Sequence, residues 1–282
     1  MRFSRRLVLA WLLLAWAIPR NSQCAWVEEH AQFPFVLRAD HTVPNAPTIL
    51  NELAELQAEL AERLGIRPAA GWIELYLFRD HEAFRAFVSR QFPGFESRRA
   101  LFIQGQTAPM VLVARGDSLA TDLRHESTHA LLHAHTAHLP LWLDEGLAEY
   151  FEHSAEQRRH EVRRDSALFD AMLKPDWPRL VRLERAQDVR RLEPSDYTAA
   201  WAWARYLIDG PSDVQIQFRA YLAEAGDRQP ERTMPERLSE LNPHVEQAMK
   251  AYWQSRLPQP VNLQATLRPA EVTTIAPAPA PE

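Results

Sequence analysis

The stretch from His125 to Glu152 carries two helical patterns on either side of a single proline, Pro140. It reads HESTHALLHAHTAHLPLWLDEGLAEYFE. No proline interrupts the first pattern, and proline is tolerated at the first position of a helix, so a second helix can begin at Pro140. We therefore expect two helices that are joined by a loop of only a few residues.

The first of these helices contains His125-Glu126-Ser127-Thr128-His129, an H-E-x-x-H pattern. Residues four apart lie on one face of a helix, with their β-carbons about 5–6 Å apart. Two imidazoles in that relation can bind one zinc ion at about 2.0–2.1 Å each. The carboxylate of Glu126 can then reach a water at the open position of the metal. Three further histidines are expected to be solvated or capping residues, because polar side chains are mostly exposed. They are His133, His135 and His138.

A catalytic zinc ion needs a third protein ligand as well as an open position. The second helix offers Glu145 and Glu149, which are four apart and share a face. A solvated acidic helix face is the alternative interpretation. Apolar residues flank the two glutamates, so we expect a positively charged group opposite them. These flanking residues are Leu143, Leu147, Tyr150 and Phe151.

The composition is that of an ordinary globular protein. Hydrophobic residues make up 46% of the 282 residues, and charged residues 24%, so the chain can bury a sizeable core. The formal net charge of −5 argues against a nucleic-acid partner, because such a partner requires a basic patch. We expect one globular domain over residues 26–257. The oligomeric state is left open.

Residues 1–25 have the pattern of a secretory signal peptide. The positive segment MRFSRR precedes LVLAWLLLAWAI, an apolar run of twelve residues, whereas a membrane span needs about 20. We therefore expect a secreted or periplasmic protein. An uncleaved membrane anchor is the alternative, and only in that case do we expect membrane contact. Cys24 is the only cysteine, so the mature domain has no internal disulfide.

The remaining patterns predict an α+β fold. Strands are expected at residues 33–38, 72–78, 100–104 and 110–114, and a helix at 49–64 is expected to end at Gly65. Asp80 is expected to cap a second helix. The pattern is helical from Asp117 almost to residue 257. A small N-terminal part with a sheet therefore precedes a mainly helical part. Pro and Ala dominate residues 258–282, which are expected to form a disordered tail.

The segments HESTHALLH and LPLWLDEGLAEYFE resemble the gluzincin metallopeptidases, which include thermolysin and the zinc aminopeptidases. The resemblance is strongest to the peptidase MA-like families, with H-E-x-x-H followed by W-L-x-E-G-x-A-E-Y. It implies a thermolysin-like fold in which His125, His129 and Glu145 bind zinc and Glu126 is the general base. Fifteen residues separate His129 from Glu145, fewer than in thermolysin or the aminopeptidases, so the connecting loop must be shorter.

The resemblance also bears on Tyr197 and Glu149. Tyr197 opens a long apolar helix and matches a tyrosine that helps hold the oxyanion in related aminopeptidases; packing beside Trp201 is the alternative. Spacing alone would choose Glu149 as the third ligand, whereas W-L-x-E-G chooses Glu145. Because a metal-bound histidine usually passes its other N–H to a carboxylate, we expect Glu149 to be the partner of His125 or His129. A small residue at Gly146 is expected to let the two helices approach closely.

These observations predict a zinc-dependent peptidase that acts on a peptide or protein substrate. Zinc would polarise the carbonyl and its water, and Glu126 would move the proton. The alternative is a catalytically silent module that keeps the metal and binds a cell-envelope partner. An intact Glu126 weighs against that alternative, because a scaffold has no need of a base.

Overall fold

The computed structural model describes residues 26–136, 138–159 and 168–257. The predicted signal peptide and tail lie outside these residues. In chain order the elements are β1 (Glu28–Gln32), β2 (Phe35–Ala39), α1 (Ala46–Leu64), β3 (Ile73–Phe78), α2 (His81–Gln91), β4 (Ala100–Gln104), β5 (Pro109–Ala114), α3 (Leu119–His135), α4 (Leu141–Phe151), α5 (Ala155–Arg159), α7 (Leu180–Glu184), the 3-10 helix η1 (Val189–Arg191), α8 (Pro194–Asp209), α9 (Ser212–Asp227), α10 (Met234–Leu241) and α11 (Val245–Arg256).

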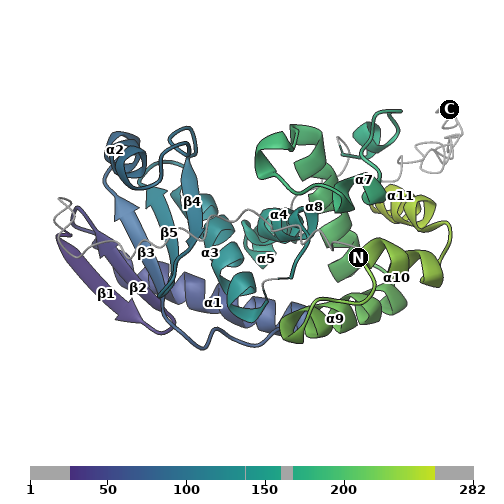
Figure 1. The fold of residues 1–282 in the computed structure, drawn as a ribbon, viewed down its shortest axis with the longest axis horizontal. Coiled ribbons are helices and arrows are strands. Elements are labelled where there is room, and N and C mark those ends of the chain that lie inside the picture. The colour runs from purple at the N-terminus through teal and green to yellow at the C-terminus, as the bar shows by residue number, and fades with distance from the viewer. Residues whose placement is uncertain (1–25, 137, 160–167, 258–282) are drawn as a thin grey trace, which may run out of the picture.

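The N-terminal part is a mixed sheet with helices on both faces (Figure 1). The strand order is β1-β2-β3-β5-β4, in which β2, β3 and β5 are parallel neighbours and the outer strands β1 and β4 run antiparallel to theirs. A mostly helical part follows, so the predicted α+β class is confirmed. Strand β1 was not predicted, because Glu28-Glu29-His30-Ala31-Gln32 exposes alternate residues at an edge and lacks an apolar run.

Alternate residues of the strands pack into two separate hydrophobic cores, one on each face of the sheet. One face carries Leu75 and Val111, which pack with α1 and α3. The other face carries Phe78 and Leu112, which pack with Phe84 and its neighbours on α2. This alternation follows from the period of two in a strand. It places α3 against β4 and β5, and thereby fixes the helix that carries the H-E-x-x-H pattern.

The local signals at two helix ends were predicted correctly. Gly65 ends α1 in the left-handed conformation, with φ of 72°, which glycine adopts without a steric penalty. The side chain of Asp80 accepts a hydrogen bond from the backbone N–H of Ala83 at 2.7 Å and caps α2. Helix α1 starts at Ala46, three residues before the predicted start, and has a proline in its first turn.

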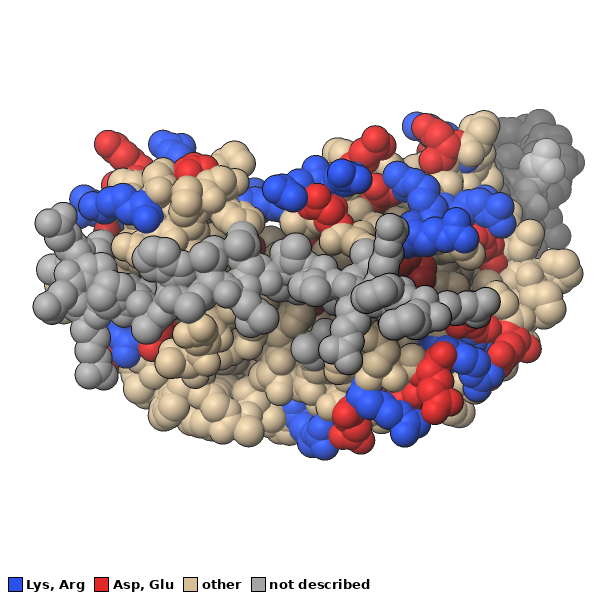
Figure 2. Space-filling view, viewed as in Figure 1, with Lys and Arg blue, Asp and Glu red and all other residues tan. Residues whose placement is uncertain are grey.

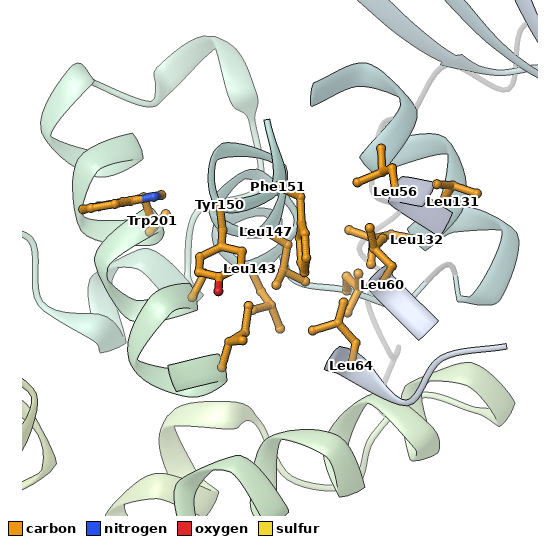
Figure 3. Close-up of a cluster of buried hydrophobic side chains, with 14 of the residues drawn as sticks. Leu56, Leu60, Leu64, Leu131, Leu132, Leu143, Leu147, Tyr150, Phe151 and Trp201 are labelled. Carbon is orange, nitrogen blue, oxygen red and sulfur yellow. The ribbon is translucent and has the colours of Figure 1, made fainter. Parts of the chain in front are cut away.

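Leucines from α1 and α3 pack against α4 in the larger core (Figure 3). The buried guanidinium of Arg124, next to the first histidine of α3, donates to the carbonyl oxygens of Phe151 at 3.0 Å and His153 at 3.4 Å. It also contacts Glu59 on α1 at 3.5 Å. Because the last carbonyls of a helix lack partners within that helix, Arg124 satisfies the end of α4 and ties it to α3.

Helix α4 also packs closely against α8. A β-carbon on Gly146 would lie 2.4 Å from the carbonyl oxygen of Ala200, so only glycine permits this approach. The sequence predicts that Gly146 lets α4 approach α3. In the structure, Gly146 instead lets α4 approach α8. At the far side of α8, Trp201 packs on Trp253 of α11, with ring centroids 5.3 Å apart.

The molecule is elongated, with the sheet at one end and α9, α10 and α11 at the other (Figure 1). In the same view, its upper outline is hollowed between the part around α2 and β4 and the helical part, where Lys and Arg gather along the rim (Figure 2). Among the described residues, no helix is long and apolar enough to cross a membrane.

Candidate metal centre

The structure brings His125, His129 and Glu145 together. One ligand atom from each lies within 4.8 Å of the others. Nε2 of His125 is 3.9 Å, and Nε2 of His129 4.0 Å, from the same Glu145 oxygen, Oε2. The two imidazoles belong to consecutive turns of α3, and their ring centroids are 5.1 Å apart. Glu145 lies in the second turn of α4. The three residues predicted as ligands therefore lie close enough together to hold one metal ion.

The second nitrogen of each imidazole contacts a carboxylate. Nδ1 of His129 donates to Oδ1 of Asp144 at 3.0 Å, and Nδ1 of His125 donates to Oε2 of Glu152 at 3.2 Å. Because a carboxylate only accepts, Nδ1 carries a proton in both rings, and Nε2 is the ring nitrogen on the side of Glu145. This is the arrangement that orients histidine ligands in zinc sites.

Asp144 and Glu152 are the hydrogen-bond partners of the two Nδ1 atoms, and the expected pairing of Glu149 with a histidine stays a prediction. Glu149 lies one turn beyond Glu145 on α4, half-buried, and its negative charge raises the pKa of Tyr197. Asp144 lies in the first turn of α4, and Glu152 lies at the C-terminal end of that helix. Both side chains contact histidines of α3.

Electrostatics in the cluster favour a positive charge between the side chains. Burial lowers the pKa of His129, but Asp144 and the neighbouring glutamates outweigh it and raise that pKa to about 10. The pKa of His125 is also raised, because the hydrogen bond to Glu152 and nearby carboxylates act against burial. Burial raises the pKa of Glu145, while the two imidazoles act in the opposite direction.

This donor set fits zinc. Two imidazole nitrogens and one carboxylate oxygen are the ligands of one class of catalytic zinc site, which leaves a fourth position open. Asp144 and Glu145 are 1% and 6% exposed, and buried carboxylates are costly unless they are paired or bind a metal. A dication would supply the charge that these groups attract.

Glu126 and Tyr197 act electrostatically on the cluster. The negative charge of Glu126 raises the pKa values of His125, His129 and Glu145. Burial raises the pKa of Tyr197, and the charge of Glu145 raises it further.

Arg98 was not predicted near the cluster. It lies in the exposed loop before β4, and its interaction with the Tyr197 hydroxyl lowers the pKa of that group. The contact joins the sheet part to α8 across the site. Nothing in the local sequence of Arg98 indicates this, because the two residues are far apart in the chain.

The three other histidines of this stretch have different environments. His138 is exposed, as predicted. His135 is half-buried against Gly226 and contacts the Leu222 carbonyl oxygen at 3.3 Å. The prediction for His133 is wrong: its side chain is 8% exposed, and Nε2 donates to Oδ2 of Asp144 at 3.0 Å. The sequence did contain a signal for this: His133 follows His129 by four residues, as His129 follows His125, so all three share a face of α3.

No protein-family model matches the sequence, and no curated protein matches it. Among solved structures, the fold is similar to the crystal structure of an M1 zinc metallopeptidase from Deinococcus radiodurans. The sequence identity is 16% and the TM-score 0.45; the match covers 83% of this chain and 52% of that one. The chain thus spans about half the length of that protein, and likeness at this level carries no inference about activity.

Proposed function

We propose that this protein is a zinc-dependent peptidase of the gluzincin type. The observation that carries the proposal is the convergence of His125, His129 and Glu145, with ligand atoms within 4.8 Å of one another, together with Glu126 next to His125 on α3. A structural metal site usually has four protein ligands, whereas three ligands with an adjacent acid are typical of hydrolytic zinc sites.

Each residue has a role that its position supports. His125, His129 and Glu145 would hold a zinc ion, which would supply polarisation of a scissile carbonyl and activation of a water. Glu126 accepts the proton of the attacking water and delivers it to the leaving amine. Tyr197 donates a hydrogen bond to the carbonyl oxygen as negative charge develops there. Asp144 and Glu152 hold the imidazoles in the tautomer that ligation requires.

The substitution Glu126→Gln tests this proposal. The variant keeps the shape of the side chain but cannot accept the proton, so hydrolysis of mixed peptides should fall by about 10²–10⁴-fold while zinc content is unchanged. The matched control is Glu156→Gln, which removes an exposed carboxylate from α5 and should leave hydrolysis at the parent rate.

Two results would count against the proposal. A Glu126→Gln variant that hydrolyses the same peptides at the parent rate would remove Glu126 as the base. A zinc-loaded parent protein that cleaves no peptide in a broad mixture would instead support the silent module that binds a partner.

A further inference from the structure

Helix α3 carries histidines on three successive turns, and the third has no place in the proposed ligand set. His133 follows His129 by four residues, as His129 follows His125. Its ring turns toward α4 and donates from Nε2 to Oδ2 of Asp144 at 3.0 Å. The other oxygen of the same carboxylate, Oδ1, accepts from Nδ1 of His129 at 3.0 Å. One buried aspartate therefore bridges two histidines.

The bridge is closed in on its other side by the sheet. The ring of Phe102 on β4 stacks on His129, with centroids 5.9 Å apart and planes at 20°, and on His133, with centroids 5.3 Å apart and planes at 27°. The side chain of Asp144 is 2% exposed, and that of His133 8%. Water therefore cannot easily replace either hydrogen bond to Asp144.

A carboxylate held through one oxygen can still rotate about its terminal bond. In the structure, Asp144 is held through both carboxylate oxygens, Oδ1 by His129 and Oδ2 by His133. Removing His133 would leave a buried anionic oxygen without that partner, which is costly unless the carboxylate rotates to find another. Rotation would take Oδ1 away from His129.

We propose that His133 is a positioning residue for the metal centre. It anchors Asp144, and Asp144 in turn holds the His129 ring with Nε2 directed at the metal position. Because Asp144 precedes Glu145 in α4, the same anchor also fixes the turn that presents the third ligand. This inference rests on the proposed zinc site and adds a residue that acts only through Asp144.

The test measures the zinc dissociation constant by competition with a chelator. His133→Phe keeps an aromatic ring against Phe102 but removes the donor, and should weaken zinc binding by about 10–100-fold, the usual effect of losing an outer partner. His133→Gln places an amide N–H near the former Nε2 and should restore most of that loss. His138→Phe, at an exposed position, is the matched control and should bind zinc as the parent does.

A double-mutant cycle separates positioning from a general loss of stability. If His133 acts through Asp144, His133→Phe should weaken zinc binding no further in an Asp144→Ala background. The visible absorption of the cobalt-substituted protein should also change in His133→Phe, because the ligand geometry relaxes. Thermal unfolding of the metal-free variants reports on folding independently of the metal.

The inference is overturned if His133→Phe binds zinc as tightly as the parent, or if its effect adds fully to that of Asp144→Ala. If His133→Phe fails to fold but His133→Gln binds zinc with full affinity, the donor role of His133 stands. If both variants lose zinc affinity equally, the donor role is contradicted. A parent protein that binds no zinc would overturn the proposed function as well, which distinguishes that failure from failure of the positioning role alone.

Discussion

At the scale of single residues, Glu145 and Glu149 differ sharply although they lie one helical turn apart. Glu145 is 6% exposed and has Oε2 3.9–4.0 Å from Nε2 of both imidazoles, whereas Glu149 is half-buried. We therefore predict that Glu145→Ala loses stoichiometric zinc and that Glu149→Ala retains it. Elemental analysis of the two purified variants checks this, and the reverse pattern would make Glu149 the ligand.

Gly146 is the residue at which α4 tolerates no side chain. A β-carbon would meet the backbone of Ala200 at 2.4 Å, so Gly146→Ala should force α4 and α8 apart and cost about 1–3 kcal/mol of the free energy of unfolding. Urea denaturation measures this. Gly71→Ala is the matched control, because nothing lies within 4 Å of its β-carbon position; equal stability of both variants would contradict the packing account.

The grouping of His125 and His129 could be predicted from sequence, because residues four apart share a face of one helix. Glu145 was chosen over Glu149 by the resemblance to W-L-x-E-G, since spacing alone favours Glu149. Asp144 and Glu152 could not be predicted in the same way. Their hydrogen bonds depend on which side of α4 crosses α3, and that is decided by the packing of α4 on α8 and on the leucines of α1.

At the scale of elements, a hydrogen bond joins α7 to α4. Nε1 of Trp142, three residues before Glu145, donates to Oε2 of the half-buried Glu184 at 2.6 Å. Burial raises the pKa of Glu184 to about 7; the hydrogen bond from Trp142 lowers it, and the negative charge of Glu236 raises it. The carboxyl is therefore about half protonated at neutral pH.

This pair gives a prediction with a definite sign. A raised pKa contributes stability that is complete below the unfolded value of 4.5 and is lost as pH rises through about 7. Glu184→Gln keeps an acceptor for Trp142 without the charge. Its free energy of unfolding, measured by urea denaturation, should exceed that of the parent at pH 8, and the difference should disappear at pH 4. Glu156→Gln, an exposed control, corrects for removal of a charge elsewhere.

The elements themselves were mostly predictable where a local signal exists. The leucine stripe of α1, the stop at Gly65 and the cap at Asp80 are short-range effects, and the structure confirms them. Strand β1 was not predictable, because its residues lack an apolar run. The partition of the sheet between two cores was not predictable either, because the pairing of β3 with β5 is a long-range contact.

At the scale of the whole molecule, the candidate metal centre lies where the two structural parts meet. Helix α3 packs on β4 and β5 of the sheet, and α4 packs on α8 of the helical part. Phe102 of the sheet stacks on His129. A metal held between α3 and α4 would therefore stabilise the contact between both parts, since ligands that bind only the folded state raise its stability.

The most direct test of this account is the zinc content of the purified protein after dialysis, measured by elemental analysis. The account predicts one zinc per chain in the parent protein and in Glu126→Gln, and none in Glu145→Ala. A parent protein without stoichiometric zinc, even after zinc has been added back and the excess removed, would contradict it.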